Sequence, residues 1–99
     1  MMRSVGLSDL DIATRALLAV PRAGWPTIAA SLIEDAHTSD LWRKRRGCPH
    51  PDGGTGSLYA QASLYPRVAT SQSSARYCAA MGVLLHALEA WRSRLHSEM

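Results

Sequence analysis

The sequence predicts an all-α fold, a small bundle of three longer helices and one short helix. Apolar residues recur at helical spacing in three segments, and no segment alternates strictly between apolar and polar residues as a half-buried strand does. A Gly/Pro-rich loop separates the second helix from the third. With 99 residues, of which 46% are hydrophobic and 19% charged, residues 1–99 are expected to form a single helical domain.

The first helix is expected to begin near Ser8, whose hydroxyl can cap the helix. Asp9 and Asp11 follow where carboxylates favour the positive end of a helix dipole. Four apolar residues then recur at helical spacing, and they are Leu10, Ala13, Leu17 and Val20. Pro21 ends the helix because it cannot donate the next hydrogen bond.

The second helix is expected to begin at Pro26, a favourable first-turn residue, and to extend to about Arg46. Gly47 follows as a left-handed cap. One apolar face consists of Ile28, Leu32, Ile33 and Ala36. The polar residues Asp35, His37 and Asp40 are expected on the other sides of the helix.

Residues 47–56 contain four glycines and two prolines, which predicts a loop. Ser57 can cap a short third helix from Leu58 to about Tyr65, which Pro66 closes. A polar connection follows, and Ser73 or Ser74 can cap the last helix.

The last helix carries the clearest periodic signal in the chain. Six apolar residues are spaced by 4, 3, 4, 3 and 4 positions, and they are Tyr77, Met81, Leu84, Leu88, Trp91 and Leu95. Such an a/d seam is typical of a helix that packs within its own chain and of one that pairs with a second copy. Because the chain has a small core and three tryptophans, we expect a homo-oligomer with this seam as its interface, without excluding core packing.

Positive charge is concentrated in the second part of the chain. Residues 43–99 hold eight Lys or Arg against three acids, whereas residues 1–42 hold three against five. The densest cluster lies at the end of the second helix, and a Gly-rich turn opens the third helix, where backbone N–H groups attract phosphate. The expected nucleic-acid-binding residues are Arg43, Lys44, Arg45, Arg46, Gly54, Gly56 and Ser57. Two alternatives remain. In the first, the cations only complement the dipole at the end of the second helix, and in the second, the Gly-rich segment is only a turn with an N-cap.

A thiol or metal site is the weaker hypothesis for chemistry. Cys48 and His50 are close in sequence, with His37 as a further candidate base or ligand. No Cys-x-x-Cys pair or His pair at i, i+4 is present, and a chain this short has little room for a walled pocket. We therefore expect no metal, no cofactor and no catalytic residue, and an enzyme centred on Cys48 and His50 is kept as an alternative.

One loop motif carries a resemblance to a known family. Residues 46–51, which include Pro-His-Pro, are followed by Gly-x-Gly-Ser-Leu at 54–58, and Ala-Leu-Leu-Ala-Val-Pro stands at 16–21. Together these motifs resemble a family of small proteins of unassigned function from Rhodobacter-type alphaproteobacteria. The resemblance implies a bacterial cytoplasmic protein, and it transfers no catalytic residue.

These observations favour a non-enzymatic helical adaptor that self-associates and binds nucleic acid or an acidic protein surface. Small-terminase subunits, which help load DNA during packaging, offer an architectural comparison only. A pure protein-interaction regulator that binds one partner helix in a groove is the other alternative. No apolar run reaches the roughly 20 residues that a spanning helix needs, so no membrane partner is expected.

Overall fold

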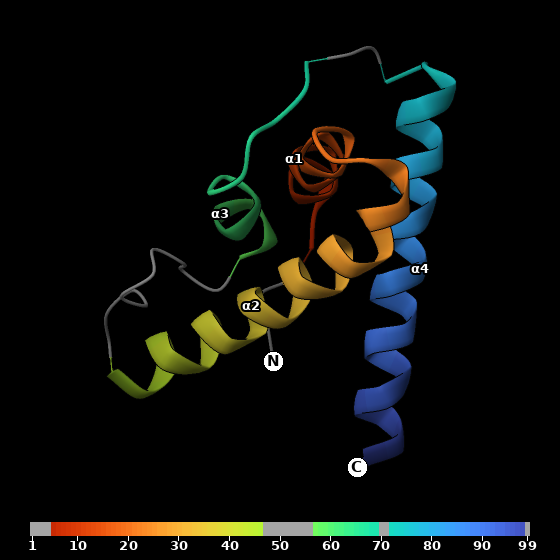
Figure 1. Ribbon diagram of the computed structural model, residues 1–99. Coiled ribbons are helices and arrows are strands. Elements are labelled where there is room, and N and C mark those ends of the chain that lie inside the picture. Colours follow the sequence, from red (N-terminus) through yellow and green to blue (C-terminus); the bar gives the residue numbers. More distant parts are fainter. Residues whose placement is uncertain (1–4, 47–56, 70–71, 99) are drawn as a thin grey trace.

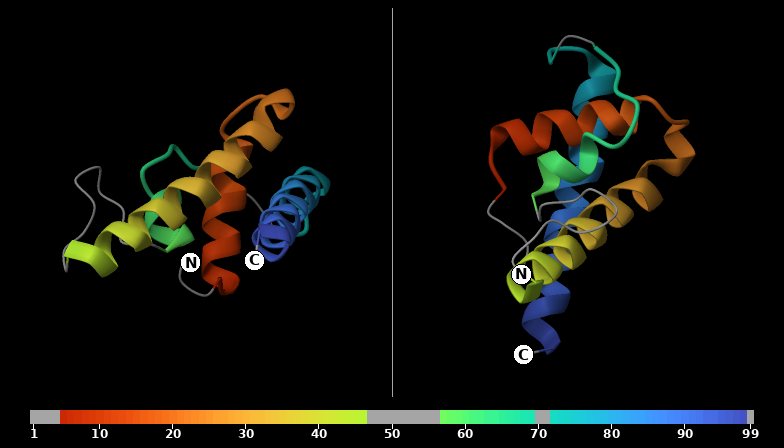
Figure 2. Two further views of the ribbon diagram at one scale, coloured as in Figure 1. Left: turned by 90° about the horizontal axis from the view of Figure 1, so that it is seen from below. Right: turned by 90° about the vertical axis from the view of Figure 1, so that its left-hand side faces the viewer.

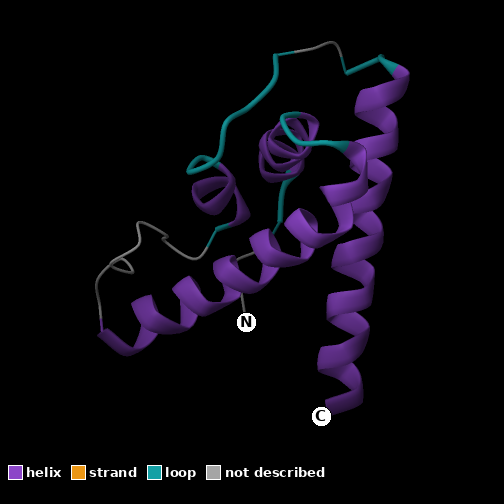
Figure 3. Cartoon of the chain, in the orientation of Figure 1, coloured by secondary structure: helices purple, strands orange, loops and turns teal. Residues whose placement is uncertain are grey.

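The computed structural model describes residues 5–46, 57–69 and 72–98, with side chains for all of these except 42–46 and 95–98. The described elements are α1 (Leu7–Leu18), a 3-10 turn η1 (Arg22–Gly24), α2 (Trp25–Arg46), α3 (Leu58–Ala62) and α4 (Ala75–Glu98). No strand occurs in these ranges (Figure 3). The expected fold class, three longer helices and one short helix, is confirmed.

The start of α1 differs from the expectation in its capping group. The helix begins at Leu7. The side chain that accepts a backbone hydrogen bond at this end is Asp9 rather than Ser8, because the Asp9 Oδ2 accepts the Gly6 N–H at 2.9 Å. Its other oxygen, Oδ1, accepts the Tyr59 N–H at 2.9 Å. One carboxylate therefore caps the first turns of both α1 and α3, which lie side by side.

The caps expected for the last two helices are confirmed. The Ser57 Oγ accepts the Ala60 N–H at 3.0 Å, and the Ser74 Oγ accepts the Tyr77 N–H at 3.0 Å. The third helix ends at Ala62, which is earlier than the expected end near Tyr65.

The helix α1 lies at the centre of the molecule. It is seen nearly end-on in Figure 1, between α4 on one side and α3 on the other, and α2 crosses beside all three (Figure 2). The core forms where these helices meet. Its largest fully buried side chains are Trp25, Leu17, Leu32, Ile33, Leu58 and Leu84, together with Thr14 and Asp40.

The helices α2 and α4 run in the same direction along their shared contact. Near their N-termini, Arg76 of α4 lies over the ring of Trp25. Further along, the Arg94 Nη2 donates to the Glu34 Oε1 at 2.8 Å, and the two helices diverge toward their C-terminal ends (Figure 1). The N-terminal ends of both helices therefore lie at the same end of their contact.

The a/d seam of α4 lies in the core of the single chain. Tyr77, Leu84, Leu88 and Trp91 are buried and Met81 is partly buried, whereas the side chain of Leu95 lies outside those described. Packing on α1 and α2 accounts for the apolar spacing without a second copy.

The expectation for Asp40 is wrong, because this residue is fully buried, as is most of Ser39. Asp40 follows Ala36 by four positions, so it continues the buried stripe of Leu32, Ile33 and Ala36 by one turn. The helix α3 packs on α2.

Adjacent leucines in α4 test the placement of the seam. Leu84 is fully buried and Leu85 is 48% exposed. We expect Leu84→Ala to lower the free energy of unfolding by about 2–5 kcal/mol, because the lost side chain leaves a cavity. Leu85→Ala, the matched control, should cost less than about 1 kcal/mol. Urea unfolding measures both, and equal effects would contradict the burial of the seam.

Candidate functional site

The expected nucleic-acid-binding residues are only partly described. The helix α2 continues through Arg46, so Arg43, Lys44, Arg45 and Arg46 form its last turn, while their side chains lie outside those described. Gly54 and Gly56 also lie outside the described residues. Ser57 is described, and its hydroxyl is used to cap α3.

Of the three residues of the thiol or metal hypothesis, the structure describes only His37. Cys48 and His50 lie outside the described residues, and the ring of His37 packs edge-on against Trp91 with centroids 5.3 Å apart. Within residues 5–46, 57–69 and 72–98, no three His, Cys, Asp or Glu side chains gather as a metal site would require.

The structure does contain an apolar groove between α2 and α4, with a volume of about 620 Å³. Buried Ile33 and Trp91 belong to its lining. The other lining residues are Pro26 and Ala30 from α2, and Ala79, Gly82, Val83, His86, Ala87, Ala90 and Arg94 from α4. We call this feature the α2–α4 groove. From Ala79 to Arg94 it follows α4 for about 22 Å, or roughly four helical turns.

Small side chains bring the helix backbone close to the surface along this groove. Ala79, Gly82 and Ala90 lie on one face of α4, and Ala30 faces them from α2. Gly82 is exposed, and a Cβ atom added at this position would meet nothing within 4 Å. The groove can therefore receive a close-packed helix or chain segment from outside.

One end of the groove carries two arginines on a single tryptophan. The guanidinium carbons of Arg22 and Arg76 lie 5.4 Å and 5.0 Å from the centroid of the Trp25 ring. In the described part of the chain, neither arginine forms an ion pair or a side-chain hydrogen bond. We call these three residues the Arg22–Trp25–Arg76 cluster. It adjoins Pro26 and Ala79, which line the groove.

A second cleft of about 630 Å³ lies on the opposite flank of α4. It is lined by Val5 and Leu10 from the start of the chain and by Leu85, Leu88, Glu89, Arg92 and Ser93 from α4. The outward face of α4 is therefore bordered by an apolar cleft on each side.

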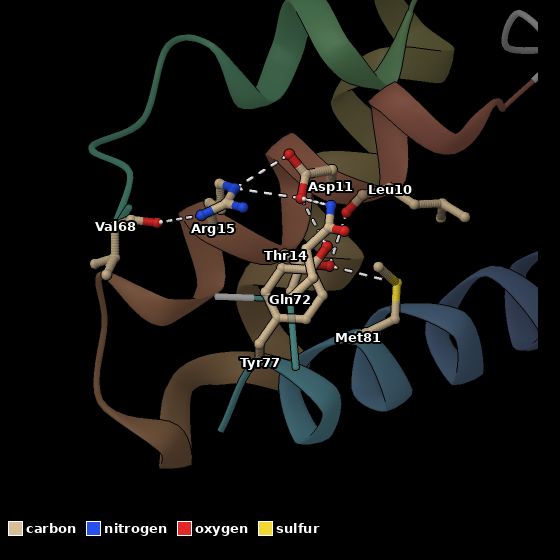
Figure 4. A network of polar contacts seen from close by, with 8 residues as sticks. All are labelled: Leu10, Asp11, Thr14, Arg15, Val68, Gln72, Tyr77 and Met81. Carbon is tan, nitrogen blue, oxygen red and sulfur yellow. Dashed lines mark hydrogen bonds and ion pairs between the residues drawn. The ribbon is translucent and has the colours of Figure 1, made fainter. Parts of the chain in front are cut away.

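A polar network ties α1 to α4 and to the segment that precedes α4 (Figure 4). The Asp11 Oδ1 accepts the Tyr77 hydroxyl at 2.7 Å and the Gln72 Nε2 at 3.1 Å. The Arg15 Nε donates to both oxygens of Asp11, and its Nη1 donates to the Val68 carbonyl at 3.3 Å. These contacts hold the chain that enters α4 against α1.

The same network shifts two pKa values. The hydrogen bond from the Tyr77 hydroxyl is the largest cause that holds the pKa of Asp11 below its ordinary 3.8, and burial of the carboxyl opposes it. Burial raises the pKa of Tyr77 above 10.0, and the hydrogen bond to Asp11 raises it further. A neutral tyrosine and an ionised aspartate are thus favoured together, which suits a structural clamp better than proton transfer at neutral pH.

The groove and the Arg22–Trp25–Arg76 cluster were not found by sequence reasoning. Arg22 and Arg76 are isolated arginines far apart in the sequence, so neither stands out. One signal was available, because Gly82 interrupts a strongly periodic helix where glycine is unfavourable.

A family model described as a domain of unknown function (DUF7742) matches residues 3–88 of the chain. No curated protein and no solved structure matches it. The match agrees with the expected membership of a family of unassigned function. Among the described helices, none combines the length and apolarity needed to cross a membrane.

Removal of the Tyr77 hydroxyl tests the network. Because the pKa of Asp11 is lowered in the folded state, its carboxylate stabilises the fold above pH 3.8, and this stability is lost as the pH falls through the lower folded value. We expect Tyr77→Phe to lower the free energy of unfolding by about 1 kcal/mol at pH 7 and by less near pH 2.

Urea unfolding between pH 7 and pH 2 measures this difference. Tyr59→Phe is the matched control, because Tyr59 is exposed and its hydroxyl forms no hydrogen bond with a described residue. A cost of Tyr77→Phe that stays constant with pH would show that the hydroxyl does not act through Asp11.

Proposed function

The chain belongs to the DUF7742 family, a domain of unknown function. From the surface of this chain we propose that it is a non-enzymatic helical adaptor. It receives one helix of a partner protein in the α2–α4 groove. The observation that carries this proposal is the groove itself, an apolar channel of about 620 Å³ along α4 with an open glycine at its wall.

The dimensions of the groove suit a helix. The α4 wall of the groove is about 22 Å long, which equals about 15 residues of helix, and the α2 wall from Pro26 to Ile33 is about 10 Å long. The apolar lining matches the apolar stripe of an amphipathic helix. The small residues Ala30, Ala79 and Ala90 permit close approach of the two backbones. This arrangement favours the interaction module over an enzyme, because the described lining residues contain no nucleophile paired with a base.

Gly82 is the residue that a free monomer explains least. Glycine inside a helix costs about 0.5–1 kcal/mol relative to alanine. No described residue obstructs a Cβ atom at this position. A partner helix that packs directly on Gly82 accounts for the missing methyl group.

Two substitutions of Gly82 separate folding from binding. We expect Gly82→Ala to raise the free energy of unfolding by about 0.5–1 kcal/mol, because alanine is the better helix former and the site is open. Gly82→Leu should also fold, since the position is exposed. Thermal unfolding measures both variants, and a strong destabilisation by Gly82→Ala would show that the position is not open.

Partner binding is tested with the same pair. A photo-reactive residue in place of Ala90, which is exposed on the groove wall, should cross-link to a helical segment of a partner in an extract of the source cells. With that partner purified, Gly82→Leu should weaken binding at least tenfold, about 1.4 kcal/mol, whereas Gly82→Ala should stay within about twofold of the wild type. Equal binding of the partner to Gly82→Leu would exclude the groove as the docking site.

A second candidate function is contact with nucleic acid or another anionic surface through the end of α2. The observation that favours it is the continuation of α2 through Arg46, which gathers four cations in one helical turn. The negative end of the helix dipole stabilises each of them by only about 0.3–1 kcal/mol, and phosphates would neutralise the cluster more completely.

Salt dependence tests this second function. Replacement of two cations, Arg45→Ala with Arg46→Ala, should weaken duplex DNA binding for all sequences and lower the salt slope by roughly 2. Arg92→Ala serves as the control, because Arg92 is an exposed cation on α4. Absence of binding by the wild type at low salt, or an unchanged slope in the double variant, would remove nucleic acid from the proposal.

A further inference from the structure

The two ends of the α2–α4 groove differ in charge. At the far end, the Arg94 guanidinium is paired with the Glu34 carboxylate at 2.8 Å, so this end is close to neutral. At the near end, Arg22 and Arg76 lie over Trp25 with no acidic partner in the described chain. Among the described residues, the positive charge without an acidic partner therefore lies at one end of the groove.

Helix direction adds to this asymmetry. Because α2 and α4 run in the same direction, the positive ends of both helix dipoles lie near the Arg22–Trp25–Arg76 cluster. The guanidinium carbons of Arg22 and Arg76 lie 5.4 Å and 5.0 Å from the centroid of one ring, so both charges lie beside the same residue. Stacking on a buried tryptophan also limits their motion, which reduces the entropy lost when a carboxylate binds.

From this charge pattern we infer that the α2–α4 groove recognises an amphipathic helix whose last turns carry Asp or Glu residues, bound antiparallel to α2 and α4. The inference rests on the proposed function, because it names the partner of the same groove. The apolar stripe of that helix packs on Gly82 and the neighbouring alanines. Its acidic C-terminal end meets Arg22 and Arg76, where guanidinium groups form charge-assisted hydrogen bonds to carboxylates.

The antiparallel orientation follows from two electrostatic attractions that favour the same direction of the bound helix. The C-terminal end of a helix carries the negative end of its dipole, and acidic side chains in the last turns add full charges to it. Both are attracted to the Arg22–Trp25–Arg76 cluster. A parallel helix would place its own positive end against Arg22 and Arg76, so the groove discriminates between the two directions.

A displayed peptide library tests the composition of the partner. The library consists of helical peptides of about 18 residues, with Ala and Leu on one stripe and random polar residues elsewhere. Selection is for binding to the wild-type protein and against binding to Gly82→Leu. We expect the selected peptides to carry Asp or Glu in their last two turns. Selected peptides without this bias, or with acids in their first turn, would overturn the inference and leave the groove in place.

Arginine variants then test the cluster with one selected peptide. Arg76→Gln should weaken binding at least tenfold, whereas Arg76→Lys, which keeps the charge and loses the planar stacking, should weaken it less. A peptide with its acids moved to the first turn should bind the wild type at least tenfold more weakly, and Arg76→Gln should reduce that difference, because Arg22 and the helix dipoles remain. Arg92→Gln, an exposed cation outside the lining of this groove, should stay within twofold.

The outcomes separate the two levels of the proposal. If no peptide distinguishes the wild-type protein from Gly82→Leu, both the groove and the acidic helix are rejected. If peptides require the open groove and bind Arg76→Gln as tightly as the wild type, only the inference about the acidic end fails. Because the peptides are compared on the folded wild-type protein as well, an unstable Arg76→Gln variant would still leave the orientation measurable.

Discussion

The burial of Trp25 is the constraint on which the rest of the structure depends. Its side chain has no exposed surface, and its indole N–H donates to the Val20 carbonyl at 3.2 Å, which closes the connection between α1 and α2. Arg76 covers the ring from α4, so the first turns of α2 and α4 are held beside each other. Both the groove between these helices and the position of its positive end follow from that arrangement.

Sequence alone predicted the elements whose signals are local. The hydroxyl caps at Ser57 and Ser74 and the periodic seam of α4 depend on residues within one or two turns of one another, so pattern reasoning finds them. The double cap by Asp9 was missed because Tyr59 lies 50 positions away in sequence. Burial of Asp40 was missed for a similar reason, since it depends on how other parts of the chain pack on α2.

The candidate site was harder to predict than the fold. Charge density directed the sequence reasoning to Arg43–Arg46 and the Gly-rich loop, whereas the groove depends on which sides of α2 and α4 remain uncovered after the core has formed. The periodic seam of α4 is compatible with core packing and with an interface, and Tyr77, Leu84, Leu88 and Trp91 are buried in the single chain, while the groove lies along the flank of α4 beside Trp91. Only three-dimensional packing decides which of two apolar faces of a helix is used internally.

An open apolar groove lowers the stability of a small domain by a larger fraction than that of a large one. A chain of this size buries only about 60–65% of its unfolded surface, so each unfilled apolar contact removes a notable part of its stability. Larger side chains at Gly82, Ala79 or Ala90 would cover more of the partly buried lining residues Val83 and Ala87 and would favour the isolated fold. The small residues leave that surface available, and a helix bound there as proposed would stabilise the folded state by linkage, because only the folded chain could bind it. Under the proposed function, the same small side chains would lower the stability of the free chain and permit recognition of the partner.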